Sequence, residues 1–211
     1  PYIPCKRRGN CAACIAHSKK TGTLTNCMEE IAIEKFDAKL PYRFPTTKIC
    51  GDFEAMSRES ARMIADVINE KPDALLCLPA GNTALRTFQI LAEMQKNGEV
   101  DFSKARFIQL DEWLDIEDET QNCGAFLEKN FYMPAGIQPE QIMPFDIHAT
   151  DLKAECKRID DWLSKNGPID VMLLGLGMNG HVGLNEPGIS WDQGAIVVDL
   201  DETTMNVGQK Y

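Results

Sequence analysis

From Thr46 onward, the chain alternates long amphipathic stretches of helical period with short apolar runs. Apolar residues that recur every three or four positions predict helices, and short apolar runs between turn residues predict strands. The predicted helices span residues 53–68, 83–95, 124–131 and 151–164, and the predicted strands span residues 75–78, 105–110, 141–145, 169–174 and 195–200. Helices and strands therefore follow one another mostly in alternation.

This alternation predicts an α/β fold, doubly wound, with a mostly parallel sheet and helices on both faces. A helix between two parallel strands makes a right-handed crossover, which places the helix against one face of the sheet. Sheets of this kind bind their ligands beyond the carboxyl ends of the strands. We therefore expect the functional residues in the loops that follow the strands at 75–78, 105–110 and 169–174.

The composition is acidic, with 32 Asp and Glu against 22 Lys and Arg and a net charge of -10. An acidic field repels the phosphate backbone, so no nucleic-acid partner is expected. No apolar run approaches the roughly 18 residues that a membrane span needs, and no secretory leader opens the chain, so no membrane association is expected. These observations predict a cytoplasmic protein.

The first 27 residues differ from the rest, because they contain five basic residues, no acidic residue and four of the eight cysteines. Four thiols at this spacing suit one tetrahedral zinc ion. The predicted ligands are Cys5, Cys11, Cys14 and Cys27, with His17 as a substitute. The alternative is a short helical arm with four reduced thiols. The zinc ion would be structural, and no cofactor is expected for catalysis.

Composition divides the chain into three parts. Residues 1–33 form the cysteine-rich, metal-binding arm, and residues 34–45 contain two prolines without clear periodicity, which indicates a linker. Residues 46–211 form the α/β domain. A chain of 211 residues can bury one substantial core beside such an appendage.

The loop after the first predicted strand reads Leu78-Pro-Ala-Gly-Asn-Thr83 and leads directly into a helix. Free backbone N–H groups at a helix N-terminus, together with the helix dipole, suit a phosphate group. The alternative is a tight turn between strand and helix in which Asn82 or Thr83 caps the helix.

The loop after the second predicted strand places Asp111 and Glu112 at its carboxyl end. A partly desolvated carboxylate can move protons to and from a carbon next to a carbonyl, and Asp111 is the one nearer the sheet. The alternative is a carboxylate that caps a helix.

The third loop, residues 175–187, is rich in glycine and contains His181 and Glu186. Its glycines match the dinucleotide fingerprint G-x-G-x-x-G, with Asp199 near the expected distance. That fingerprint needs a helix directly after the glycines, and residues 181–194 contain four glycine or proline residues and no helical apolar stripe, which excludes nucleotide binding. We instead predict a loop that presents His181 to a small ligand, with Glu186 orienting the imidazole.

These three loops together identify a family resemblance. The segments Leu78-Pro-Ala-Gly-Asn-Thr83, Leu110-Asp-Glu-Trp113 and Gly177-Met-Asn-Gly-His-Val-Gly-Leu-Asn-Glu-Pro187 resemble the motifs of the glucosamine-6-phosphate deaminase family, in the right order. The resemblance covers the chain from about Lys48 to Tyr211. The related 6-phosphogluconolactonases share the fold and the glycine-histidine loop, but the run Asn-Glu-Pro is similar to the amino-sugar branch.

The resemblance implies an enzyme that converts a hexosamine 6-phosphate to a ketose 6-phosphate and ammonia. Asp111 would move a proton between C1 and C2, and His181 would open the sugar ring with help from Glu186 and Asn179. The implied residues for the substrate and its phosphate are Ala80, Gly81, Asn82, Thr83, Gly177 and Lys210. The protein would be a homo-oligomer, and the choice between glucosamine and galactosamine stays open.

Two departures from the family pattern bear on function. Ile196 and Val198 stand where allosterically regulated members carry an Arg-x-Lys pair, so that phosphate-binding regulatory site is expected to be missing. Family members also continue beyond the position of Tyr211, so we expect the natural chain to be longer. If it were not, a sugar-phosphate-sensing protein without catalysis would be the alternative, and a 6-phosphogluconolactonase-like hydrolase is the other.

Overall fold

The structure is a computed structural model that describes residues 47–190 and 192–208. Residues from Ile49 onward form one compact unit. The zinc hypothesis for the four N-terminal cysteines and His17, the linker at 34–45 and the phosphate-binding role of Lys210 all fall outside the described residues. None of the described helices is both long and apolar enough to cross a membrane.

The sheet has four parallel strands in the order β3-β2-β1-β4. The strands are β1 (Leu75–Leu78), β2 (Arg106–Gln109), β3 (Ile142–Met143) and β4 (Val171–Met172). The chain steps outward from β1 to β2 and β3, and then returns to place β4 on the other side of β1. This reversal creates a switch point between β1 and β4, and open α/β sheets bind their ligands beyond the carboxyl ends of the strands at such a point.

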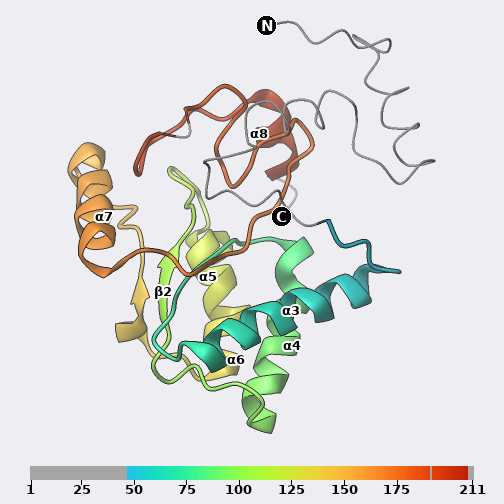
Figure 1. Cartoon of the computed structure of the whole chain (residues 1–211). Coiled ribbons are helices and arrows are strands. Elements are labelled where there is room, and N and C mark those ends of the chain that lie inside the picture. Colours follow the sequence, from blue (N-terminus) through green and yellow to red (C-terminus); the bar gives the residue numbers. More distant parts are fainter. Residues whose placement is uncertain (1–46, 191, 209–211) are drawn as a thin grey trace, which may run out of the picture. The chain divides into compact units, whose positions relative to one another are not determined.

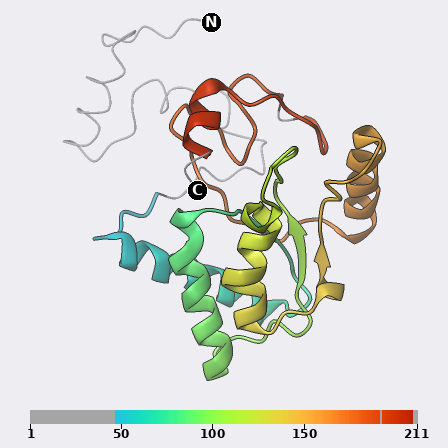
Figure 2. The ribbon, with the colours of Figure 1, turned by 180° about the vertical axis from the view of Figure 1, so that it is seen from behind.

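Helices cover both faces of the sheet, which confirms the doubly wound fold (Figures 1 and 2). One face carries α3 (Phe53–Glu70), α4 (Asn82–Asn97), α5 (Cys123–Leu127), the π-helical turn η2 (Glu128–Tyr132) and α6 (Met133–Ala135). The opposite face carries α7 (Leu152–Asn166). The remaining described helices are η1 (Glu119–Gln121), η3 (Pro139–Gln141) and α8 (Glu202–Gly208).

The alternation of side chains along the strands divides the core into two layers. Leu76 and Phe107 pack with α3 and α4, whereas Leu75 and Ile108 pack against α7. The first layer is aromatic: the rings of Phe107 and Phe131 lie 5.9 Å apart in an edge-to-face arrangement. All four of these strand residues are at least 96% buried, so the carboxyl ends of β1 and β2 project from a rigid base.

The capping residues explain where the long helices begin. The carboxylate of Asp52 accepts a hydrogen bond from the Ala55 N–H at the start of α3, at 2.7 Å. Asp151 caps α7 in the same way. In α4, the N-cap is Gly81, with φ of +119°, and because glycine has no side chain it makes no side-chain cap. The alternative in which Asn82 or Thr83 caps this helix is therefore wrong.

The strand predicted at 195–200 is also wrong. These residues are unpaired in the structure, and the N–H of Ala195 donates to the carboxylate of Asp160 on α7, at 2.8 Å. A side chain thus satisfies the backbone group that a neighbouring strand would have paired. The apolar run 195–200 is followed by α8, which the sequence did not predict.

Candidate active site

Glu112 anchors the loop after β2 to the start of α5. Its carboxylate accepts hydrogen bonds from four groups: the N–H groups of Trp113 (2.8 Å), Cys123 (2.8 Å) and Gly124 (2.9 Å), and Nε2 of Gln109 (2.6 Å). A carboxylate at a helix N-terminus is favoured by the free N–H groups and by the helix dipole. The helix-capping alternative considered for this pair of carboxylates therefore describes Glu112.

Asp111, the neighbouring carboxylate, remains available for proton transfer. Burial raises its pKa to about 6, the hydrogen bond from the Cys123 thiol lowers it, and the charge of Glu112 raises it further. A carboxyl group that titrates close to neutral pH can both take up and release a proton in one catalytic cycle. The two adjacent carboxylates thus differ in their surroundings: hydrogen bonds hold Glu112, and the pKa of Asp111 is raised.

Two buried thiols lie close to Asp111, and sequence reasoning gave neither of them a role. Cys77 is 3% exposed and Cys123 is 5% exposed. Burial raises the pKa of Cys77 to about 12 and moves the pKa of Cys123 well above its ordinary value. Both side chains therefore stay protonated and neutral around neutral pH, and Cys123 can act as a permanent weak donor to Asp111.

The glycine-histidine loop after β4 is folded by its own backbone. The Gly177 N–H donates to the His181 carbonyl at 2.8 Å, and the Gly180 N–H donates to the Gly177 carbonyl at 3.1 Å. The imidazole of His181 occupies the space that a Cβ on residue 177 would need, so only glycine fits there. Residues 181–190 form turns and isolated bridges instead of a helix, in agreement with the exclusion of the dinucleotide fingerprint.

A relay of polar side chains orients His181. Asn179 Nδ2 donates to the carboxylate of Glu186 at 2.7 Å, and Asn179 Oδ1 lies 2.7 Å from His181 Nδ1. The N–H of Asp201 also donates to Glu186, at 3.0 Å. We expected Glu186 to orient the imidazole, and its effect passes through Asn179. Thr204, which sequence reasoning missed, completes the relay, with its Oγ1 3.1 Å from His181 Nδ1.

The relay defines which nitrogen of His181 carries the proton. Burial raises the pKa of Glu186, but the hydrogen bonds from Thr204, Asp201 and Asn179 outweigh it and lower the pKa overall, so the group is ionised and can only accept hydrogen bonds. The Asn179 amide must therefore direct its NH₂ group to Glu186 and its oxygen to the imidazole. An oxygen facing Nδ1 requires a proton on Nδ1, which in the neutral imidazole leaves the lone pair on Nε2.

The loops after β2 and β4 meet at Gly183. A Cβ on Gly183 would lie 3.6 Å from Asp111 Oδ2, and this residue is two positions from His181. In Figures 1 and 2 the loop after β2 and the segment from 175 to 208 lie at the same end of the domain. The third predicted loop, with Ala80 and Gly81, leaves the central strand β1 between them. The fold therefore places the three predicted loops after neighbouring strands, at the carboxyl edge of the sheet.

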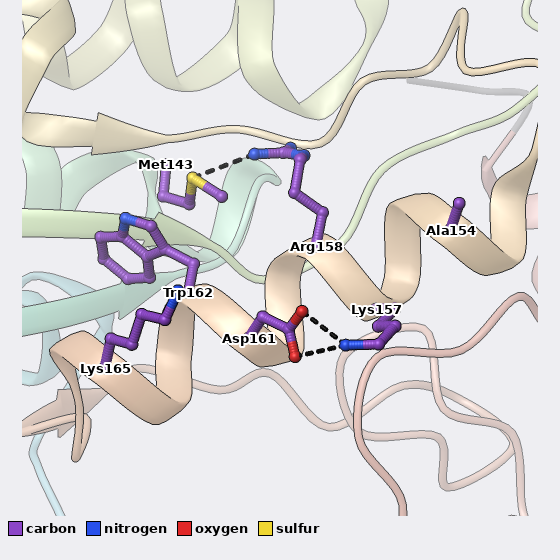
Figure 3. Close-up of a pocket in the computed structure, with 7 residues that line it drawn as sticks. All are labelled: Met143, Ala154, Lys157, Arg158, Asp161, Trp162 and Lys165. Carbon is purple, nitrogen blue, oxygen red and sulfur yellow. Dashed lines mark hydrogen bonds and ion pairs between the residues drawn. The ribbon is translucent and has the colours of Figure 1, made fainter.

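A separate groove of about 540 Å³ runs along α7 (Figure 3). Among its charged side chains, Lys157 pairs with Asp161 at 2.7 Å, and Arg158 donates to the sulfur of Met143 at 3.3 Å. The lining also includes Trp162, and none of the predicted site residues belongs to it. The groove is therefore distinct from the candidate active site.

No metal centre is found in the part of the chain that the structure describes. Within residues 47–190 and 192–208, no three His, Cys, Asp or Glu side chains are grouped so that they could hold an ion.

Comparison with known proteins connects this geometry to a family. The family model described as glucosamine-6-phosphate isomerases/6-phosphogluconolactonase matches residues 53–184. A glucosamine-6-phosphate deaminase from Thermoanaerobacter sp. (strain X514) is 36% identical over 161 residues, which cover 76% of this chain and 64% of that protein. Glucosamine-6-phosphate deaminase 1 from Bacillus subtilis (strain 168) is 34% identical over 163 residues, with 77% and 67% covered.

Solved structures agree with this result. A structure described as a monomeric glucosamine-6-phosphate deaminase superimposes with a TM-score of 0.73 and 33% identity, covering 77% of this chain and 68% of that one. A 6-phosphogluconolactonase from Plasmodium vivax shares the fold, with a TM-score of 0.58 and 20% identity over 65% of this chain and 50% of that one. The chain thus spans about two thirds of the length of its deaminase relatives. On the strength of the family model and these relatives, the chain belongs to the glucosamine-6-phosphate isomerase/6-phosphogluconolactonase family.

Proposed function

We propose that the protein converts a hexosamine 6-phosphate to a ketose 6-phosphate and ammonia. The observation that carries this proposal is the presence of a half-buried carboxyl group with a raised pKa, Asp111, and an oriented imidazole, His181, on loops that meet at Gly183. The reaction needs one group for ring opening and one for proton transfer between carbons. The two groups match those two tasks.

In the proposed mechanism, His181 Nε2 takes the proton from the anomeric hydroxyl and returns it to the ring oxygen, which opens the ring. Asp111 then removes the proton from C2 and delivers it to C1 through an enediol-like intermediate. Water adds at the resulting C2 imine and the amine leaves as ammonia. Each catalytic group returns to its starting protonation state, so no cofactor is consumed.

The phosphate would bind at the N-terminus of α4. This helix differs from α3 and α7 because its N-cap, Gly81, supplies no side-chain oxygen to the first turn. Its first turn also contains no acidic residue that would repel an anion. The N–H groups of Asn82 and Thr83 would therefore donate to phosphate oxygens, and Lys210 would add a positive charge.

The test is a measurement of ammonia and ketose 6-phosphate release from glucosamine 6-phosphate and from galactosamine 6-phosphate. If either sugar is converted by the wild type and is not converted by His181→Gln, the proposal is supported. The sugar that is converted faster then shows whether the substrate is glucosamine 6-phosphate or galactosamine 6-phosphate. His148→Gln is the matched control, because His148 is a 71% exposed surface histidine paired with Glu119. Hydrolysis of 6-phosphogluconolactone instead would assign the lactonase alternative. Binding of a sugar phosphate without turnover would assign the sensor alternative.

Other properties of the whole protein also stay proposals. We propose a structural zinc ion on the four N-terminal cysteines, a homo-oligomer and a cytoplasmic location. Metal analysis of the purified protein tests the first, and its molar mass in solution tests the second. A monomeric deaminase exists among the similar solved structures, so the oligomeric state of this chain must be measured.

A further inference from the structure

Thr204 is a buried polar residue between exposed neighbours on α8. Its exposed fraction is 5%, whereas its neighbours Thr203 and Met205 on α8 are exposed. Burying a hydroxyl group costs free energy unless it has hydrogen-bond partners. The hydrogen-bond partners of Thr204 belong to the His181 relay, so this side chain links α8 to the glycine-histidine loop.

The hydroxyl has three contacts, and their donors and acceptors can be assigned. Oγ1 accepts a hydrogen bond from Asn179 Nδ2 at 3.2 Å and lies 3.1 Å from His181 Nδ1. Asn179 Oδ1 faces Nδ1 at 2.7 Å, so Nδ1 carries the proton and Oγ1 is an acceptor towards the imidazole. The hydroxyl hydrogen is then left for the Glu186 carboxylate, whose pKa Thr204 helps to lower. Thr204 Oγ1 and Asn179 Oδ1 therefore both accept from Nδ1.

We propose that Thr204 is a positioning residue: with Asn179 it holds His181 in the Nδ1-protonated tautomer, so that the Nε2 lone pair faces the reacting sugar. This inference rests on the proposed function for its catalytic consequence, but the tautomer is a property of the resting protein. The residue acts through His181 and has no contact of its own with substrate in this proposal.

The role of Thr204 follows from the chemistry of Asn179. An aspartate at position 179 would hold the imidazole by charge as well as by direction, whereas an amide holds it by direction alone. The charge in this relay is on Glu186, one side chain farther from the ring. A second acceptor on Nδ1–H keeps the amide and the ring aligned, because Thr204 contacts both.

The experiment compares Thr204→Val, Thr204→Ser and Thr203→Val. Valine keeps the branched shape but replaces the hydroxyl by a methyl group, and serine restores the hydroxyl. Thr203→Val makes the same chemical change at the adjacent, exposed position of α8. Long-range ¹H–¹⁵N correlation spectra report the protonation of each imidazole nitrogen. The chain has three histidines, so His181→Gln assigns the His181 signals.

We expect the wild type to show a protonated Nδ1 and an unprotonated Nε2 at His181. Thr204→Val should produce a mixture of tautomers and lower kcat about tenfold with KM unchanged, as expected for one lost buried hydrogen bond. Thr204→Ser should restore the single tautomer and the wild-type kcat. Thr203→Val should change neither the tautomer nor kcat.

Two results would overturn the proposal. One is a wild-type imidazole protonated on Nε2, which can be measured even if the valine variant does not fold. The other is a folded Thr204→Val protein with wild-type nitrogen signals and kcat. A wild-type protein with the expected tautomer but no turnover of either sugar would uphold the positioning role and reject the proposed function.

Discussion

The two halves of the candidate active site are built in opposite ways. Asp111 lies at the end of a buried strand, and burial is the largest cause of its raised pKa. His181 lies on a half-buried loop, where polar contacts at 2.7 Å and 3.1 Å fix the direction of its ring. Burial therefore raises the pKa of Asp111, whereas the direction of hydrogen bonds determines which ring nitrogen of His181 carries the proton.

The residues that surround Asp111 and His181 also differ. Asp111 contacts a neutral thiol donor, while the adjacent Glu112 takes four hydrogen bonds and holds the loop in place. His181 instead depends on residues far along the chain, with Thr204 23 positions away. The two proposed catalytic groups and the side chains that hold them in place are thus different residues.

The largest expected effect is the loss of turnover when Asp111 is substituted. Asp111→Asn removes the base but keeps its shape, so we expect turnover to fall about a thousandfold, within the range for loss of a general base. Sugar-phosphate binding should persist, because the phosphate would bind at α4. Steady-state kinetics and calorimetric binding measure the two quantities. If Asp111→Asn stays active while Glu112→Gln is inactive and folded, the roles of the two carboxylates are reversed.

On the loop side, Gly177→Ala should displace the imidazole without touching any charged group. The new Cβ would occupy the space of the His181 ring, and a ring displaced by about 1 Å can cost about a hundredfold in rate. Gly175→Ala is the matched control, since a Cβ there meets no atom within 4 Å. Kinetics together with thermal unfolding separate loss of geometry from loss of fold. Equal activity of the two variants would contradict the close contact between Gly177 and the His181 ring.

A third measurement sharpens the contrast through stability. The folded-state pKa of Asp111, about 6, lies above its unfolded value of about 3.9, so its ionisation opposes folding as pH rises from about 4 to 6. Above pH 6 the penalty is about 2–3 kcal/mol, and below pH 4 it vanishes. Asp111→Asn should therefore be the more stable protein at pH 8 and similar to wild type at pH 4. Urea unfolding at both pH values tests this. A variant that is less stable at pH 8 would show that Asp111 is not held in a dry environment.

The smallest expected effect concerns the thiol beside Asp111. The base must be ionised, so activity falls on the acidic side of its pKa. Cys123→Ala removes a donor and should move this acidic limb upward, whereas Cys123→Ser offers a stronger donor and should move it downward, each by up to about one pH unit. The pH dependence of kcat/KM measures both. Shifts in the same direction would mean that packing, and not hydrogen bonding, sets the effect.

Periodicity in the sequence predicted the central elements well. The strand at 75–78 coincides with β1, and the helix at 151–164 lies within a residue or two of α7, because each is set by local apolar spacing and turn residues. The strand at 195–200 was wrong for a non-local reason. Its apolar run has β propensity, but pairing needs a free neighbouring strand edge, and here Asp160 binds the backbone instead.

The candidate site was predictable in its reacting groups and less so in their partners. Asp111 and His181 stand in short loops next to glycines, carboxylates and strand ends, where local sequence marks them. Their partners Cys123 and Thr204 lie in unremarkable helical sequence, and only three-dimensional proximity relates them to the site. Cysteine and threonine occur in many structural roles, so neither residue gives a local sequence pattern that would mark it as part of the site.

The sequence by itself determined the alternation of helices and strands, the three strand-end loops and the types of group that can do chemistry. These depend on interactions between residues close along the chain. The tertiary structure decided which of two adjacent carboxylates has a raised pKa and which binds the first N–H groups of α5. It also decided which side chains surround the His181 imidazole, because burial and hydrogen-bond partners depend on segments that meet only when the chain folds.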